Sequence, residues 1–305
     1  MKVSDYDQYK YDYKEYWKDR SYENDAERHL LRKTFAKLKG DWFIDIGGSF
    51  GRNLDLYYSK YEHPVILDYS LLTLQKNQSE ILKTFPNTIL IAANAYNLPF
   101  RDNSFDGGLM VRVLHHINKP EAYFKELKRV MSQESIYIQE FANKIHIKAA
   151  LKNLLKPNLS FFSTEPYQQP THGNHEGTKG EDTYFLNFHP KHIRRLLEEN
   201  SFVPMKKCGV SYFRIPFLKK HLPNAILRFF ETFMQLLLGW TSIAPSIFFI
   251  SKKINGVSSQ KAQRLEDILI CPKCNGSLQF TEERAQCVQC KTIYRQDKGI
   301  WDFRA

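Results

Sequence analysis

The chain has 305 residues, which allows one full α/β domain and a smaller module. Charged residues make up 25% of the chain and interrupt its apolar stretches, and residues 1–20 are tyrosine-rich and charged, so we expect an ordinary soluble core, no cleavable signal peptide and a cytoplasmic location. The formal net charge is +11, and the whole excess lies in residues 141–264, which hold 18 Lys and Arg against 7 Asp and Glu.

The first forty residues predict an N-terminal helical cap. Six aromatic residues occur among charges up to Trp17, and residues 23–38 then carry apolar side chains at helical spacing, namely Leu30, Leu31, Phe35 and Leu38. The aromatic residues either cover a ligand cleft or pack against the body, since aromatic side chains are buried for both reasons.

A glycine turn follows an apolar strand over residues 42–46 and precedes a helix over 53–58. Glycines at positions 47, 48 and 51 let backbone N–H groups approach a ligand that side chains would hold away. The next apolar run ends at Asp68, 23 positions after Asp45, which is near the offset at which a second-strand carboxylate meets a ribose. The spacing differs from the dinucleotide fingerprint and lacks a P-loop lysine, so the pattern indicates a nucleotide cofactor other than NAD or ATP.

Further strands and helices alternate after this unit. We expect strands over 88–92, 106–111, 135–140, 202–210 and 245–251, and helices over 120–131 and 190–200. Such alternation predicts a doubly wound α/β sheet. Ligands bind outside the carboxyl ends of its strands, where Asp45, Asp68, Asn94 and Arg112 all fall.

In this region the chain resembles class I S-adenosylmethionine-dependent methyltransferases of the type 11-like group. The resemblance rests on ordered segments over about 100 residues, which together are more specific than any one motif: Asp45 to Gly51, Leu67 to Tyr69, Ala93 to Phe100, Ser104 to Asp106, Val113 to His116 and Glu126 to Val130.

The resemblance implies a Rossmann-like fold and S-adenosylmethionine as the cofactor. It implies that Asp45 and the turn hold the methionine end and that Asp68 holds the ribose hydroxyls. It also implies that Tyr69 and Ala95 border the adenine, with Asn94 at the position that accepts from the adenine amino group, and that a lid forms over the cleft. Asn94 stands where an aspartate is usual, and it keeps an acceptor but loses the charge. The predicted cofactor-binding residues are Asp45, Gly47, Gly48, Ser49, Gly51, Asp68, Tyr69, Asn94, Ala95 and Arg112, and the lid residues are Tyr16, Trp17, Arg20 and Tyr22.

No catalytic residue is assigned. His115 and His116 follow the fourth strand beside the expected methyl position, where either is able to act as a base. Similar histidine pairs also pack or cap the next helix, and methyl transfer from a sulfonium needs few catalytic groups.

Two later segments each allow two interpretations. Residues 156–184 form an insertion loop, in which His172 and His175 are expected to belong to a polar substrate loop rather than a metal site.

Residues 223–240 carry a wide apolar stripe flanked by basic residues, which suits a membrane surface or an apolar substrate. Burial of this stripe is the expected outcome.

The four cysteines near the C-terminus form two C-x-x-C pairs, and this spacing predicts one zinc ion held by Cys271, Cys274, Cys287 and Cys290. A cytoplasmic chain disfavours the alternative of two disulfides. Four thiolate ligands leave no position for water, so the zinc is expected to be structural. Residues 265–305 resemble the small zinc-ribbon activator proteins that partner methyltransferases acting on RNA and a translation release factor.

The sequence therefore predicts a cap over 1–40, a methyltransferase domain over 41–253, a linker over 254–264 and a zinc ribbon over 265–305. The methyl acceptor is unidentified. The basic segment and the ribbon favour RNA or an acidic protein, such as a translation protein, whereas the apolar stripe favours a small or lipid-like acceptor at a membrane surface. A noncatalytic binding module is the other alternative.

Overall fold

One large sheet forms the body of the molecule. The computed structural model describes residues 13–155, 159–169, 185–258 and 262–304. In these residues eleven strands pair in the order β10-β11-β12-β13-β3-β2-β1-β4-β5-β9-β8. Their bounds are β1 (Gly40–Ile46), β2 (Tyr61–Asp68), β3 (Ile89–Ala92), β4 (Phe105–Met110), β5 (Met131–Ala142), β8 (Phe202–Val210), β9 (Ser246–Lys253), β10 (Leu278–Phe280), β11 (Arg284–Cys287), β12 (Ile293–Asp297) and β13 (Ile300–Asp302). A separate pair consists of β6 (Tyr167–Gln168) and β7 (Leu186–Asn187).

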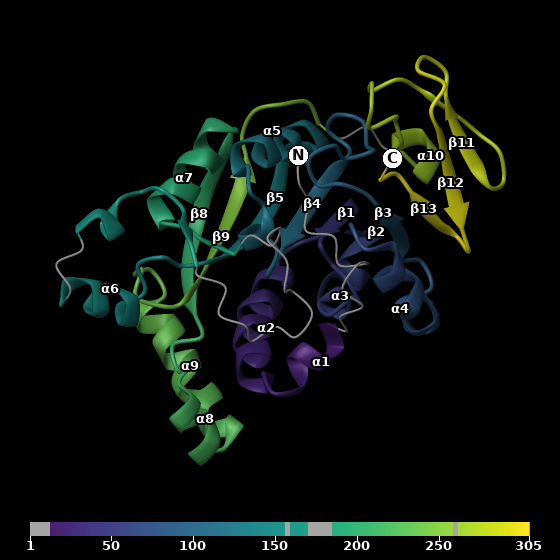
Figure 1. Ribbon diagram of the computed structural model, residues 1–305. Helices are drawn as coiled ribbons and strands as arrows, with labels where there is room; N and C mark the ends of the chain where they lie inside the picture. Colours follow the sequence, from purple (N-terminus) through teal and green to yellow (C-terminus); the bar gives the residue numbers. More distant parts are fainter. Residues whose placement is uncertain (1–12, 156–158, 170–184, 259–261, 305) are drawn as a thin grey trace.

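Helices cover both faces of this sheet (Figure 1). The described helices are α1 (Tyr13–Lys18), α2 (Ser21–Phe35), α3 (Leu54–Tyr57), α4 (Leu71–Thr84), α5 (Pro120–Val130), α6 (Ile147–Leu154), α7 (Pro190–Glu199), α8 (Pro216–His221), α9 (Asn224–Leu238) and α10 (Leu265–Ile268). Alternate residues of β1 enter different cores: Trp42 and Ile44 pack with α5 and α7, whereas Phe43 packs with α2 and α4. The five strands β3-β2-β1-β4-β5 are parallel, which confirms the predicted doubly wound sheet.

Local signals in the sequence explain where the helices begin. Ser70 is the N-cap of α4, and its Oγ accepts a hydrogen bond of 3.0 Å from the Thr73 N–H. Pro120 and Pro190 occupy the first turns of α5 and α7, where a missing N–H costs nothing. Helix α4 begins shortly after β2 ends at Asp68, so its N-terminus lies at the carboxyl edge of the sheet.

The ribbon forms a continuous sheet with the main domain. Strand β13 pairs in parallel with β3, with Trp301 opposite Ile91, and the Phe303 N–H donates to the Ala92 carbonyl at 2.7 Å. The indole N–H of Trp42 donates to the Ala262 carbonyl at 2.8 Å, so the segment before the ribbon also contacts the main domain. Ribbon side chains and main-domain side chains share one apolar core.

The expected burial of the apolar stripe is wrong. On α9 the buried side chains are Leu227 and Glu231, while Phe229 is 70% and Leu236 79% exposed. The helix therefore turns most of its large apolar side chains to the outside. In the described part of the chain, no helix is long and apolar enough to cross a bilayer. His172 and His175 lie outside the described residues.

Candidate functional site

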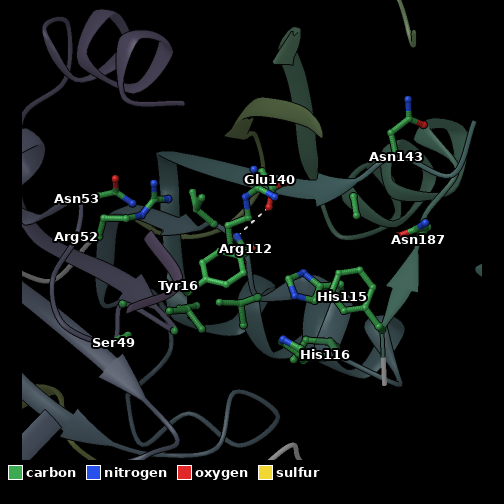
Figure 2. A pocket seen from close by; sticks show the side chains of 18 of the residues that line it. Tyr16, Ser49, Arg52, Asn53, Arg112, His115, His116, Glu140, Asn143 and Asn187 are labelled. Atoms are coloured by element: carbon green, nitrogen blue, oxygen red, sulfur yellow. Dashed lines mark hydrogen bonds between the residues drawn. The ribbon is translucent and has the colours of Figure 1, made fainter. Parts of the chain in front are cut away.

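A cavity of about 770 Å³ lies at the carboxyl ends of β1, β2, β3 and β4. Figure 2 shows its lining, to which the turns after these strands, α1 and α6 contribute. Parallel strands place the residues that follow them at one edge of the sheet, which explains why the predicted residues meet there. All ten predicted cofactor-binding residues except Gly51 line this cavity.

Two positions in the turn after β1 have a backbone conformation that favours glycine. Gly47 has φ +75° and Gly51 has φ +74°. A Cβ on Gly47 would lie 2.3 Å from the Val113 Cγ2, which is far inside van der Waals contact. Ser49 adopts φ +50°, so it takes the left-handed conformation in the middle of the turn. Glycine at position 47 is therefore required by both its backbone conformation and its contact with Val113.

Asp68 at the end of β2 ties this turn to the next one. One carboxylate oxygen accepts from the Ser49 N–H at 3.0 Å, and the other accepts from the Ser70 N–H at 2.9 Å. These two contacts fix the orientation of the Asp68 carboxylate. The predicted ribose-binding carboxylate thus lies against the glycine turn at the edge of the cavity.

Asp45 is buried at the end of β1, with 3% of its surface exposed. The Tyr57 hydroxyl donates to its Oδ2 at 3.0 Å. Burial raises the pKa of Asp45 to about 7, although the Tyr57 hydrogen bond and the Arg52 charge oppose the shift. The Asp45 carboxyl group is therefore partly protonated near neutral pH.

The raised pKa of Asp45 predicts a pH-dependent stability. Because the folded-state pKa lies above the ordinary value of 3.8, the folded protein binds more protons, and this contribution to stability is full below pH 3.8 and is lost as the pH rises through about 7. We expect Asp45→Asn to raise the melting temperature at pH 8 and to change it little at pH 4. Asp102→Asn, at an exposed carboxylate, serves as the control. An equal effect at both pH values would contradict the assigned pKa.

The residues predicted to border the adenine differ in their contacts. The Asn94 Oδ1 accepts from the Tyr96 N–H at 3.0 Å, so it stabilises the turn after β3 as well as lining the cavity. Tyr69 is contacted by the C-terminal segment: the Arg304 guanidinium lies 5.8 Å from the Tyr69 ring centre and donates to the Tyr69 carbonyl at 3.3 Å. The end of the ribbon therefore reaches one wall of the site.

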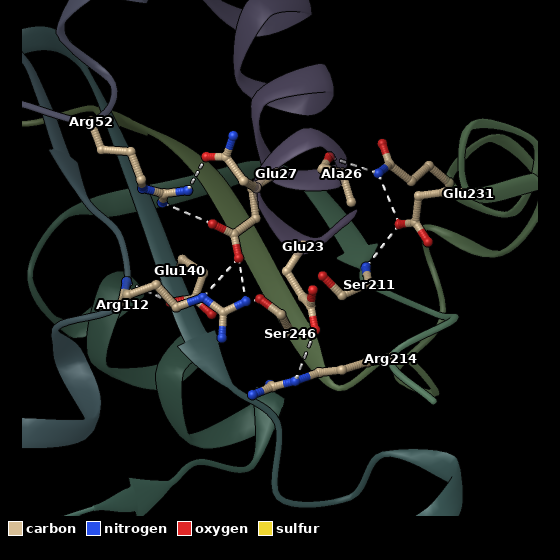
Figure 3. A network of polar contacts seen from close by, with 12 residues as sticks. Glu23, Ala26, Glu27, Arg52, Arg112, Glu140, Ser211, Arg214, Glu231 and Ser246 are labelled. Carbon is tan, nitrogen blue, oxygen red and sulfur yellow. Dashed lines mark hydrogen bonds and ion pairs between the residues drawn. The ribbon is translucent and has the colours of Figure 1, made fainter. Parts of the chain in front are cut away.

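A buried ion-pair network behind the cavity was not predicted (Figure 3). Glu27 of α2 has no exposed side-chain surface and pairs with Arg52 at 2.8 Å and with Arg112. Burial alone would raise the pKa of Glu27, but the two guanidinium groups hold it below its ordinary value. The Arg112 N–H also donates to the buried Glu140 at 2.8 Å. Arg112, which we predicted as a cofactor ligand, therefore lines the cavity while its guanidinium binds Glu27.

Only part of the predicted lid lies over the cavity. Tyr16 and Trp17 of α1 line it, and the Arg52 guanidinium stacks 3.8 Å from the Trp17 ring. Arg20 stacks 4.1 Å from the Tyr16 ring and so supports the lid from behind. Tyr22 instead is buried and donates to Glu231 of α9, so its proposed role in the lid is wrong.

Comparison with known proteins assigns the central part of the chain. Residues 44–138 match the family model described as "Methyltransferase domain". The chain contains a methyltransferase domain. A structure of an S-adenosylmethionine-dependent methyltransferase from Thermotoga maritima has the same fold, with a TM-score of 0.54 and 15% identity over 81% of this chain and 98% of that one. The methyltransferase of a Haloferax volcanii complex with the Trm112 methyltransferase activator matches with a TM-score of 0.50 and 11% identity over 78% and 94% of the two chains.

Sequence relatives cover less of the methyltransferase chain. An uncharacterized protein of Methanocaldococcus jannaschii is 34% identical over 143 residues, which are 46% of this chain and 53% of the relative. A demethylmenaquinone methyltransferase of Renibacterium salmoninarum is 29% identical over 103 residues, which are 34% and 42% of the two chains. The chain thus spans about half the length of the curated relatives that it matches.

The histidines after β4 of the methyltransferase domain line the far half of the cavity, which is the half opposite Ser49 and Asn53 (Figure 2). His115 is buried, and its ring lies 4.0 Å from that of His116 and 4.4 Å from that of Phe185. Asn187 on β7 also lines this half, and its buried Oδ1 has no hydrogen-bond partner among the described residues. These groups surround the space beyond the predicted cofactor positions.

The four cysteines of the ribbon converge. Their sulfur atoms lie within 4.8 Å of one another, with Cys271 and Cys290 at 3.6 Å and Cys274 and Cys287 at 3.4 Å. A tetrahedral zinc ion with Zn–S bonds of about 2.3 Å needs sulfur separations of about 3.8 Å, so the cluster fits this metal. Cys208 is also free and is buried elsewhere in the fold.

Proposed function

We propose that the protein transfers a methyl group from S-adenosylmethionine to an acceptor in the far half of the cavity. The observation that carries the proposal is the Asp68 carboxylate, which lies at the end of β2 against the glycine turn of a methyltransferase domain. In this position it is placed to accept hydrogen bonds from ribose hydroxyls.

Polar atoms without partners support the fit of this cofactor. The Ser49 Oγ and the Asn53 Oδ1 are buried, line the cavity and have no hydrogen-bond partner in the described part of the chain. Buried polar atoms are normally satisfied, so a ligand with both an acceptor and a donor is expected beside them. The carboxylate and ammonium of the cofactor's methionine end provide these groups. A Cβ at Gly48 would lie 2.9 Å from the Ile66 side chain, which explains the glycine in this cradle.

The protein's part in the reaction is to orient the acceptor and to exclude water. When bound, S-adenosylmethionine supplies a methyl group that is already activated on a sulfonium. Trp17 and Tyr16 close one side of the cavity, and the His115 and His116 pair lines the space for the acceptor. Correct alignment of the acceptor accounts for most of the catalysis expected here, so we assign no catalytic base.

We expect Asp68→Ala to weaken S-adenosylhomocysteine binding more than tenfold, as measured by titration calorimetry. Each hydrogen bond to a charged group contributes about 1.5–3 kcal/mol, and the ribose offers two hydroxyls. Asp102→Ala is the matched control, since Asp102 is an exposed carboxylate in a pair with Arg129. Unchanged affinity in Asp68→Ala would refute the site. No binding by the wild-type protein would support the noncatalytic alternative instead.

For the acceptor we propose an apolar small molecule. Phe185 lies against His115, and the cavity is also lined by Ile147, Leu151, Ile215 and Ile243. The demethylmenaquinone methyltransferase among the relatives acts, by its name, on demethylmenaquinone, which is not a macromolecule and so supports a small-molecule acceptor. RNA or an acidic protein, which the basic segment favours, is the competing proposal. Labelled methyl groups from the cofactor, added to a native lysate, are expected in the organic extract; label in the RNA or protein fraction would replace our proposal.

We propose that the cysteine cluster holds one structural zinc ion and that the ribbon supports the cofactor site in cis. The contact between Arg304 and Tyr69 supports this role. The Haloferax volcanii complex shows a methyltransferase of this fold together with a separate activator. When the ribbon is part of the same chain, its contact with the methyltransferase domain is intramolecular and does not require binding between two separate proteins.

A further inference from the structure

Helix α9 presents an apolar face to the outside. Its exposed apolar side chains recur at intervals of three and four residues, so they share one side of the helix within an arc of roughly 120°. They are Ile226, Phe229, Phe230, Phe233, Leu236, Leu237 and, just after the helix, Trp240. No described charged side chain lies within this stripe, because Arg228 and Glu231 fall outside the arc.

The opposite face of α9 is fixed to the domain by a buried carboxylate. Glu231 is 2% exposed and accepts a hydrogen bond from the Ser211 N–H at 2.8 Å (Figure 3). It also accepts from the Tyr212 N–H at 3.0 Å and from the Tyr22 hydroxyl. Rotating the apolar face inward would carry Glu231 outward and leave the Ser211 and Tyr212 N–H groups without their acceptor, which is costly. The outward apolar face is therefore a stable property of the fold.

Neighbouring helices extend this surface to the cavity. On α6 the side chains of Ile147, Leu151 and Leu154 are 53%, 56% and 60% exposed, again at helical spacing. On α8 Phe217 is 67% exposed. Ile147 and Leu151 also line the cavity, together with Ile215 just before α8. The Ile147 N–H donates to the Ile243 carbonyl at 3.0 Å, so the start of α6 lies beside the segment that follows α9, at the cavity.

The charges on these helices are mostly basic, and two of them, Lys219 and Arg228, pair with Glu23 and Asp25 of α2. Helices α6, α8 and α9 contain five Lys and Arg residues, namely Lys148, Lys152, Lys219, Lys220 and Arg228, and their one acidic residue, Glu231, is buried. Figure 1 shows α8 and α9 projecting from the body of the molecule, a convex shape that suits a deformable surface better than a rigid protein groove. Apolar side chains flanked by Lys and Arg are typical of helices that lie in the interface of an anionic bilayer.

We propose that α6, α8 and α9 dock the enzyme on a bilayer of anionic phospholipids. The aromatic and aliphatic side chains of α9 enter the acyl boundary, while the exposed Lys148, Lys152 and Lys220 contact headgroups. We further propose that an apolar acceptor enters the cavity from the bilayer, and this step rests on the proposed methyltransferase function. The membrane contact itself rests on the exposed face and the charges alone.

The test is flotation of the full chain with vesicles of phosphatidylglycerol and phosphatidylcholine. We expect the wild-type protein to float, and the double variant Phe229→Glu and Phe233→Glu to lose more than tenfold in vesicle affinity with an unchanged melting temperature. Ile293→Glu is the matched control, because Ile293 is an apolar residue of the ribbon, 45% exposed, outside this surface. The control is expected to float like the wild-type protein.

Two results would overturn the docking proposal. One is a wild-type protein that stays unbound at low ionic strength, where the attraction between lysines and anionic lipid is strongest. The other is a dimer in light scattering that the double variant dissociates, which would assign the surface to a second copy of the chain. S-adenosylhomocysteine titration of the same samples tests the methyltransferase proposal separately from the docking proposal. A protein that floats but does not bind S-adenosylhomocysteine would refute the methyltransferase proposal alone.

Discussion

Cys287→Ser is expected to lose the zinc ion and to unfold the ribbon. Cys287 is fully buried, and its sulfur lies 3.4 Å from that of Cys274. Structural zinc sites of this type contribute about 10–16 kcal/mol of apparent binding free energy at pH 7, which a module of about forty residues cannot replace with its own core. Elemental analysis of the purified protein and hydrogen exchange over residues 271–304 measure the two effects.

The same substitution is expected to affect the methyltransferase domain. Unfolding removes β13 from the edge of β3 and withdraws Arg304 from Tyr69, so the edge strand and one wall of the cofactor site become exposed. We therefore expect faster exchange at residues 89–92, lower solubility and weaker S-adenosylhomocysteine binding, while β1, β4 and β5 stay protected.

Cys208→Ser provides the control, because Cys208 is a buried free cysteine outside the cluster. It is expected to keep one zinc ion per chain. Freshly purified wild-type protein without zinc would contradict the metal site. Full cofactor affinity in a Cys287→Ser protein whose ribbon is unfolded would contradict the supporting role of the ribbon and leave the methyltransferase proposal intact.

Glu27→Gln is expected to lower the free energy of unfolding by about 3–5 kcal/mol, because it leaves buried guanidinium groups without their counter-charge. Arg52 and Arg112 both pair with this carboxylate, and Arg52 also stacks on Trp17 of the lid. Urea unfolding at pH 7 measures the loss. We also expect a less ordered lid, seen as faster hydrogen exchange in α1.

The effect of Glu27 should depend on pH. Its folded-state pKa lies below the ordinary value of 4.5, so its contribution to stability is present above pH 4.5 and is lost as the pH falls through the folded value. The difference between Glu27→Gln and the wild-type protein should therefore shrink in acid. Glu80→Gln is the control, since Glu80 forms an exposed pair with Lys14 that is expected to contribute less than about 1 kcal/mol. Equal stability of Glu27→Gln and the wild type would refute the network.

The sequence by itself determined the features that depend on local pattern. The apolar run before Gly47, the carboxylates at the ends of β1 and β2, and the spacing of the four cysteines are each contained in a short segment. Parallel strands then bring Asp45, Asp68 and Asn94 to one edge of the sheet by geometry alone. Asp45, Asp68 and Asn94 therefore line one cavity, as their positions after the strands predict.

Only the tertiary structure decided which partners distant residues meet. Glu27 lies 85 positions from Arg112, and nothing in the pattern of α2 distinguishes it from a solvent-exposed glutamate. Similarly, the spacing of α9 predicts an apolar stripe but not the direction in which it points. Glu231 decides that direction through Tyr22, 209 positions away, and through Ser211. A buried carboxylate must find donors, and this requirement outweighs the burial of the stripe.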